Sequence, residues 1–404
     1  MISGALRGSF SRGNALAFVV LFGFTSMFGD IVYEGARSIS GPYLAVLGAS
    51  ATTVGIVAGL GELVGYSLRV VFGYLSDRTH RYWPITISGY TLTMVAVPLL
   101  AVAGHWQVAA VLLVLERLGK AIRTPARDAM LSHATSEMGR GWGFGLHEAL
   151  DQVGATIGAL FVAAALVTSD SYRLGFALLA IPGALALGTL MSARLLYPAP
   201  HELETASPPL TPRGFPRRYW VYLAAVALVA AGYTDFPLIA FHFREESTIR
   251  ESFIPLYFAV AMATDALAAL VFGWLFDRVG LGILMAVSLL SALFAPLAFL
   301  GNAPVALLGV ALWGVGFGAQ ESIMRAAIAP MVSIQRRGTA YGIFNTGYGL
   351  FWFMGSALMG VLYDLSLPAL IVFSSAMQLA SVPMLYWVSK LTSVSPPTDQ
   401  RGGK

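Results

Sequence analysis

The chain has 404 residues, of which 57% are hydrophobic and only 11% are charged, and its formal net charge is +4. Ordinary soluble domains carry about 25% charged residues, and a soluble fold cannot cover this much apolar surface. With a mean hydropathy of +0.71, the chain is neither a soluble enzyme nor a disordered or ordinary nucleic-acid-binding protein. It has no cysteine, which excludes disulfides and thiolate metal sites.

Apolar blocks of about 20 residues, the length that crosses a bilayer core, predict about twelve transmembrane helices. Arg7 and Arg12 precede an apolar run that is too long for a cleavable signal peptide, so we expect a cytoplasmic N-terminal tail. The first half of the chain holds the predicted spans 14–36, 49–75, 83–103, 106–128, 141–165 and 172–195. The second half holds the predicted spans 219–241, 252–275, 281–300, 303–328, 339–363 and 366–389.

A segment rich in proline and charge, YPAPHELETASPPLTPRGFPRR, separates the two halves and has the composition of an exposed linker. We therefore expect a six-helix bundle over residues 1–196, a linker over 197–218 and a second six-helix bundle over 219–404. Lys and Arg gather in the loops that share one side with both termini. The excess of basic residues there predicts that the termini and the linker are cytoplasmic.

The two halves repeat a short motif. The sequence GYLSDR from Gly73 to Arg78 recurs as GWLFDR from Gly273 to Arg278. A second repeat relates Arg140-Gly141 to Arg337-Gly338 at a similar spacing. Matched loops in two sets of six spans indicate two pseudo-symmetric helix bundles with a substrate path between them.

The loop GYLSDRTHRYWPI resembles the signature of the major facilitator superfamily, G-x-L-x-D-R-x-G-R-[RK], between the second and third helices. The matching residues are Gly73, Leu75, Asp77, Arg78 and Arg81. The resemblance covers essentially the whole chain and implies a twelve-helix transporter of a bacterial inner membrane. It also implies a gating loop, in which Asp77, Arg78 and Arg81, and their repeats Asp277 and Arg278, hold one conformation closed.

Two further segments resemble narrower groups within that superfamily. Gly145, Gly154 and Gly158 have the spacing found in helix 5 of drug–proton antiporters, although Ala159 replaces the expected proline; simple helix packing is the alternative. The residues from Glu116 to Gly154 resemble a bacterial subgroup with R-x-G-K-x-x-R-x-x-x-R-D-A and F-G-x-H-x-x-x-D-x-x-G. Some members are associated with metal or drug resistance, but this chain lacks a histidine-rich tail.

Charged residues within the spans are the candidate functional residues, because a charge at the bilayer centre costs roughly 2.5–3.5 kcal/mol. Asp30 and Glu34 lie four residues apart and share one helix face near Arg37. This pair could share a proton, or it could form a surface cluster at the outer end of the helix. His147 and Asp151 have the same spacing and could carry a proton.

The fourth predicted helix is the most basic, and some of its charges must pair or extend to the membrane surface. The candidate residues there, expected partly in the cavity and partly at the cytoplasmic end, are Arg117, Lys120, Arg123 and Arg127. The remaining acidic candidates for proton coupling or the substrate cavity are Glu148, Asp235, Asp265 and Glu321. Asp235 precedes Pro237, which predicts a kink, and Glu321 and Arg325 could neutralise each other.

The sequence lacks a phosphate-binding loop and a nucleophile elbow, so we expect neither ATP-driven transport nor an enzyme, and no cofactor or resident metal. We predict an all-α, monomeric secondary transporter that binds a small-molecule substrate and protons. Proton-coupled export of a small amphipathic or cationic compound is the leading hypothesis. Three alternatives stay open: uptake or exchange of an organic anion, export of a divalent metal, and a non-transporting membrane receptor.

Overall fold

A computed structural model describes residues 12–135, 140–198, 214–332 and 336–393, and every regular element among them is a helix. The first half consists of α1 (Arg12–Val46), α2 (Ala51–Thr79), α3 (Tyr82–Leu99) with η1 (Leu100–Val102), α4 (Trp106–Thr135), α5 (Arg140–Ser169), α6 (Tyr172–Leu178) and α7 (Ala180–Leu196). The second half begins with α8 (Arg217–Gly232), α9 (Phe236–Glu245), η3 (Glu251–Phe253) and α10 (Ile254–Val279). It continues with α11 (Gly282–Ser291), α12 (Phe294–Leu300), α13 (Ala303–Ala326), η4 (Ala329–Met331), α14 (Arg337–Leu365) and α15 (Leu367–Ser393).

Within the described residues, eleven helical segments are long and apolar enough to cross a membrane. The long helix outside that set is α4, whose 30 residues include six charged side chains between Glu116 and Asp128. These charges lower the hydropathy of α4, and three of the charged residues, Glu116, Arg117 and Arg123, are buried in the bundle. The prediction of an all-α membrane protein is confirmed.

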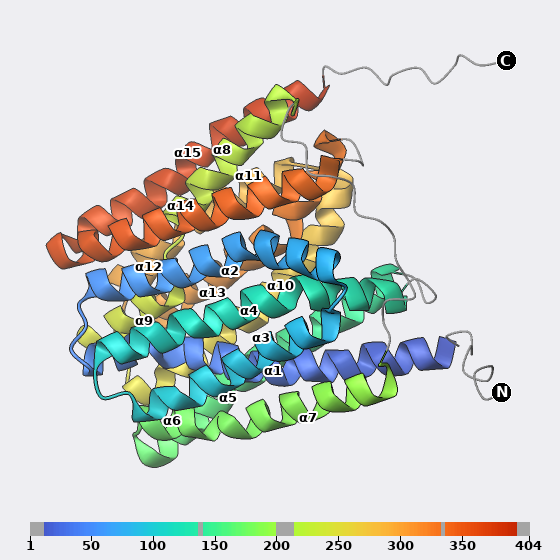
Figure 1. Cartoon of the computed structure of the whole chain (residues 1–404). Coiled ribbons are helices and arrows are strands. Elements are labelled where there is room, and N and C mark those ends of the chain that lie inside the picture. The colour runs from blue at the N-terminus through green and yellow to red at the C-terminus, as the bar shows by residue number, and fades with distance from the viewer. Residues whose placement is uncertain (1–11, 136–139, 199–213, 333–335, 394–404) are drawn as a thin grey trace, which may run out of the picture.

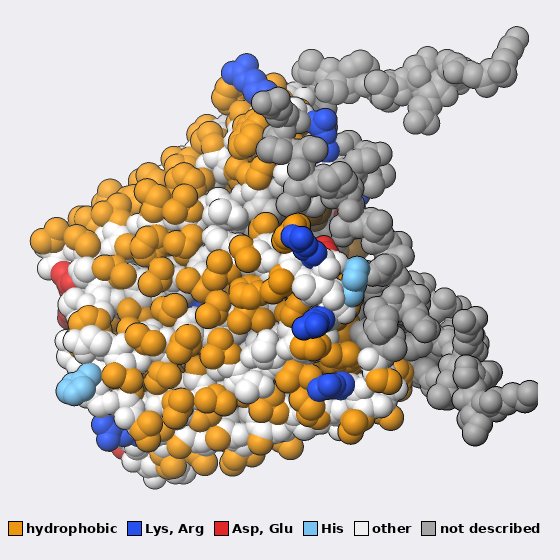
Figure 2. Space-filling view, viewed as in Figure 1, with side chains coloured by type: hydrophobic (Ala, Val, Ile, Leu, Met, Phe, Trp, Pro, Cys, Tyr) orange, Lys and Arg blue, Asp and Glu red, His pale blue; other side chains and the backbone are white. Residues whose placement is uncertain are grey.

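The helices run side by side, with α5, α6 and α7 of the first half at the bottom of Figure 1, α8, α14 and α15 of the second half at the top, and helices of both halves between them. We call the end at which α1 begins and α15 finishes the terminal end, and the opposite end the far end. Apolar side chains cover most of the face in Figure 2, and Lys and Arg gather toward the terminal end. This distribution suits a helical bundle surrounded by lipid.

The halves meet along three helix pairs: α2 with α14, α5 with α10, and α1 with α9. Close approach depends on glycine, because a side chain at Gly41 would collide with the backbone of Pro237. At the far end, Asp364 accepts hydrogen bonds from the backbone N–H and hydroxyl of Thr52, at 2.9 and 2.6 Å. These contacts between the halves close the far end.

Several predicted spans differ from the structure. The sixth is divided into α6 and α7, and the ninth into α11 and α12. The first was predicted to end at residue 36, but α1 continues to Val46, so Arg37 lies within the helix and the prediction of a helix end there was wrong. The seventh is interrupted, because α8 ends at Gly232 and α9 begins at Phe236. Pro237 lacks the N–H that a continuous helix requires, and it is well tolerated in the first turn of α9.

Candidate functional site

A cavity of about 960 Å³ lies between the two halves, and we call it the central cavity. Its wall includes residues from the middle of α1 and from the terminal-end portions of α2, α4, α5, α10 and α13. It therefore extends from the middle of the bundle toward the terminal end, while the far end is closed. Its predicted site residues are Asp30, Glu34, Arg117, Lys120, Arg127, His147, Glu148, Asp151, Asp265 and Glu321.

Arg37 forms the deepest charged group of the central cavity and joins the two halves. Its Nη2 donates a hydrogen bond to Asp235 Oδ1 at 2.8 Å, and the two side chains are 3% and 1% exposed. The same guanidinium lies 3.6 Å from Glu62 and 3.7 Å from Glu34. Three carboxylates around one arginine leave a net negative group, which is costly to bury unless a further cation or proton binds.

The break between α8 and α9 positions Asp235. This residue precedes the first turn of α9, where the unpaired N–H groups of a helix favour negative charge. Trp352 Nε1 lies 3.4 Å from the second oxygen of Asp235. Asp235 thus lies one layer deeper than the central cavity, behind Arg37, rather than in its wall.

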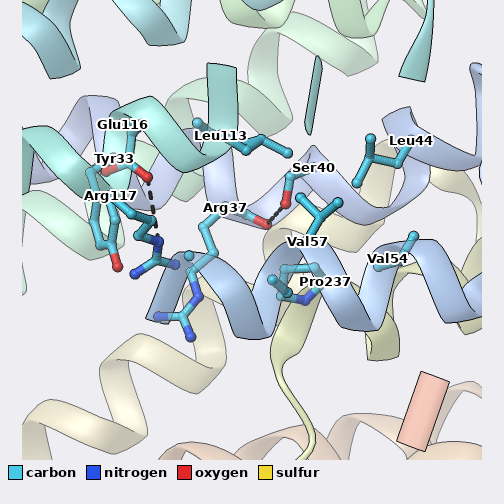
Figure 3. Close-up of a pocket in the computed structure, with 13 residues that line it drawn as sticks. Tyr33, Arg37, Ser40, Leu44, Val54, Val57, Leu113, Glu116, Arg117 and Pro237 are labelled. Carbon is cyan, nitrogen blue, oxygen red and sulfur yellow. Dashed lines mark hydrogen bonds and ion pairs between the residues drawn. The ribbon is translucent and has the colours of Figure 1, made fainter. Parts of the chain in front are cut away.

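A second arginine lies beside Arg37, as Figure 3 shows. Arg117 contacts Glu62 at 2.8 Å and Glu116 at 3.4 Å, and its guanidinium stacks over Tyr33. Glu62 therefore bridges the two arginines. A pocket of about 30 Å³ on the far-end side of this pair is lined by both arginines, Tyr33 and Glu116, which is space for about one or two waters.

Our sequence analysis missed Glu62 and Arg69, both of which line the central cavity. Each lies within an otherwise apolar stretch of α2, so the general cost of intramembrane charge would have identified them.

The pair His147 and Asp151 forms a separate group with Arg127. Asp151 Oδ2 lies 3.6 Å from His147 Nε2 and 3.8 Å from Arg127 Nη1. Arg127 also contacts Asp128 at 2.9 Å and donates to Ser26 at 2.8 Å. A titratable pair beside a fixed cation, in contact with the central cavity, can exchange protons with its water.

Two predicted roles on α4 and α13 differ from the observed geometry. Arg123 does not line the central cavity; it is 2% exposed, donates to Thr93 at 2.8 Å and stacks over Tyr90, so it ties α4 to α3. Glu321 and Arg325 both line the cavity, but the ion pairs among the described residues do not join them. The expected neutralisation of this pair was wrong.

The predicted gating loop lies at the terminal end, toward which the central cavity extends. Arg78 and Arg81 are exposed, and Arg78 donates to Tyr74 at 3.3 Å. In the repeat, Asp277 is exposed and Arg278 stacks over Trp274 at 3.4 Å. Gly73 lies near Pro125 of α4.

The helix 5 glycines pack α5 against α1. Side chains at Gly154 and Gly158 would collide with the backbone of Met27 and Ile31, respectively. Gly145 lies in α5, but its surroundings fall outside the described residues. Gly355, the counterpart of Gly158 in the repeat, packs in the same way against Ala231 of α8.

Within the described residues, no three histidine or carboxylate side chains converge as metal ligands. His147 and Asp151 supply two candidate ligands, and the nearest further partner is the cation Arg127. The donor set thus suits a proton or an organic group better than a divalent metal.

The family model described as the Major Facilitator Superfamily matches residues 13–241 and 221–403. Uncharacterized proteins of Mycobacterium tuberculosis and Mycobacterium bovis are each 42% identical to the chain over 400 residues, covering 97% of both chains. An uncharacterized MFS-type transporter of Methanocaldococcus jannaschii is 25% identical over 382 residues, covering 92% of this chain and 94% of its own.

Solved structures of transporters share the fold at low sequence identity. The nucleoside transporter NupG has a TM-score of 0.71 at 12% identity, over 93% of this chain and 99% of its own. The peptide transporter POT in complex with sulfate has a TM-score of 0.73 at 16% identity, over 95% and 98%. A bacterial homolog of the lysosomal transporter Spinster, in an inward-facing and unoccupied conformation, has a TM-score of 0.70 at 14% identity, over 97% and 100%.

Proposed function

The chain belongs to the major facilitator superfamily and has the fold of a secondary transporter, and on that premise we propose that it exports a small amphipathic or cationic compound in exchange for protons. The two halves would rock about the central cavity, opening it alternately at the terminal end and the far end. The proposal also places the chain in a bacterial inner membrane as a monomer, with both termini in the cytoplasm. In that orientation the cavity opens to the cytoplasm, as an exporter loading cargo requires.

The observation that carries the proposal is Asp265, a buried carboxylate in the wall of the central cavity. It is 1% exposed, and its Oδ1 has no hydrogen-bond partner. The ion pairs among the described residues do not include Asp265. Burying an isolated charge is costly, and a bound proton or a bound cation removes that cost. Because Asp265 would bind either a proton or the cargo but not both, cargo binding would displace the proton, and this competition would couple the transport of the two.

The rival hypotheses receive less support from the same geometry. A purely anionic cargo would leave the carboxylates Asp265, Glu148 and Glu321, all of which line the central cavity, without a positively charged partner. Divalent metal export lacks a converging ligand set among the described residues. A non-transporting receptor would not need a cavity of about 960 Å³ that contacts both halves.

Proton release on cargo binding tests the proposal. We would add tetraphenylphosphonium, a lipophilic cation, to detergent-solubilised protein in weakly buffered solution and record the pH. The proposal predicts proton release from the native chain, little release from Asp265→Asn, and unchanged release from Asp170→Asn, a matched change at an exposed residue at the far end. Binding without proton release would contradict proton coupling.

A further inference from the structure

The central cavity holds two sets of ionisable side chains that do not form ion pairs with each other. In the described part of the chain, no carboxylate lies within ion-pair distance of the cations Arg69, Lys120 and Arg325. Likewise no basic side chain lies within that distance of the cavity carboxylates Asp30, Glu148, Asp265 and Glu321. All seven line the central cavity.

Two of the three cations, Lys120 and Arg69, belong to α4 and α2, which pack against each other, and we call them the basic wall; Arg325 lies on α13. The ammonium of Lys120 lies 3.8 Å from the centre of the Tyr33 ring, and the guanidinium of Arg69 lies 4.7 Å from that of Tyr66. The attraction of a cation to an aromatic face holds it in place without satisfying its N–H donors. These donors remain available to an anionic group in the cavity.

Three of the four carboxylates, Glu148, Asp265 and Glu321, belong to α5, α10 and α13, and we call them the acidic wall; Asp30 lies on α1. Helix α10 packs against both α5 and α13, so Glu148 and Asp265 lie on neighbouring helices. A side chain at Gly318 would meet the carboxylate of Asp265, which places that carboxylate against α13, one turn from Glu321. The unpaired Oδ1 of Asp265 is buried beside the cavity, and it is an acceptor for a cationic group.

Keeping opposite charges apart in a low-dielectric site costs more than pairing them, and a ligand that meets both sets of charges would remove that cost. We infer that the cargo is an amphipathic zwitterion, with a cationic group bound at the acidic wall and an anionic group at Lys120 and Arg69. Its apolar body packs on side chains between the walls, including Tyr33, Tyr66 and Phe317. The inference rests on the proposed function and narrows its cargo class.

A matched set of four probes on one skeleton tests the inference. Phenylalanyl-phenylalanine is the zwitterion, its C-terminal amide is the cation, its N-acetyl form is the anion, and the doubly blocked form is neutral. Calorimetric titration of the solubilised full-length chain compares their affinities. Since a charged hydrogen bond contributes about 1.5–3 kcal/mol, the zwitterion should bind at least about tenfold more tightly than either singly charged form.

Two variants assign each charge of the zwitterion to its wall. Lys120→Gln should bind the zwitterion no better than the amide, and unchanged amide binding would show that this variant is folded. Asp265→Asn should bind the zwitterion no better than the N-acetyl form. Arg250→Gln and Asp170→Asn remove the same charges from exposed residues at the far end, and they should leave all four affinities unchanged.

The outcomes separate this inference from the proposed function. Equal affinity for the zwitterion and the amide overturns the inference, and so does an equal loss of all four probes in Lys120→Gln. If tetraphenylphosphonium releases protons but the zwitterion does not bind, the inference fails and the proposed function stands. If neither compound has any effect on the native chain, both fail.

Discussion

The contact between Arg37 and Asp235 joins the halves at a distance of 2.8 Å, and it should be made only while the far end is closed. Replacing Asp235 by Asn preserves the size of the side chain and removes its charge. We expect this substitution to shift the protein toward the conformation with an open far end. Fold and expression should survive, because Asn is also favoured immediately before a helix.

The size of this shift follows from the contacts that Arg37 loses in Asp235→Asn and from those that it keeps. A hydrogen bond between charged groups contributes about 1.5–3 kcal/mol. Arg37 keeps Glu62 at 3.6 Å and Glu34 at 3.7 Å, so we take a value near the lower end of that range. About 2 kcal/mol corresponds to roughly a 30-fold change in the ratio of the two conformations.

The chain contains no cysteine, so spin labels can be attached at introduced cysteines alone. Cysteines replacing His105 and Glu246, exposed residues in far-end loops of the first and second halves, report their separation by double electron–electron resonance. Asp235→Asn should transfer population from the short to the long distance.

The matched control is Glu62→Gln, which removes a carboxylate near Arg37 that belongs to the same half as Arg37. It should leave the distance distribution close to that of the native chain. An unchanged distribution in Asp235→Asn would refute the reasoning, as would an equal shift in Glu62→Gln, because the effect would then not depend on a contact between the halves.

Three other substitutions test separate parts of the account. Asp364→Asn should lengthen the same far-end distance, because it weakens the hydrogen bonds from Thr52 at 2.6 and 2.9 Å; an unchanged distance would remove this contact from the far-end closure. Gly158→Val should destabilise the fold by about 1–3 kcal/mol, because the new side chain meets the α1 backbone. Its thermal unfolding midpoint should fall, whereas Gly188→Ala, in open space, should not change it. Asp151→Asn should bind cargo but lose transport driven by a proton gradient, and normal gradient-driven transport would exclude Asp151 from the mechanism.

Hydropathy and a repeated loop were sufficient to predict the helical membrane fold and the family. The ends of the helices were harder to predict, because a charged residue within an apolar run can either mark the end of a span or be paired inside the bundle. Arg37 resembled the end of a span in the sequence, yet three carboxylates from α1, α2 and the α8–α9 break surround it. The sequence alone does not show that Arg37 pairs with Asp235, which lies 198 positions away along the chain.

Ten of the predicted residues line the central cavity, but Glu62 and Arg69 were missed and the pairings were predictable only in part. Spacing along one helix correctly placed His147 near Asp151. The same rule suggested that Glu321 and Arg325 pair, although both instead face the central cavity. Spacing shows that two side chains share a helix face, whereas the competing partners on neighbouring helices decide whether they meet.

Exchange of protons for a cationic compound is the central claim, and transport in proteoliposomes tests it most directly. We would enclose a pH-sensitive dye, impose a proton gradient, and add tetraphenylphosphonium, nickel or an organic anion such as benzoate. The account predicts that the lipophilic cation alone triggers a proton flux through the native chain, and that Asp151→Asn abolishes this flux while Arg250→Gln retains it. A flux triggered by benzoate but not by the cation, or no flux with any compound, would contradict the account.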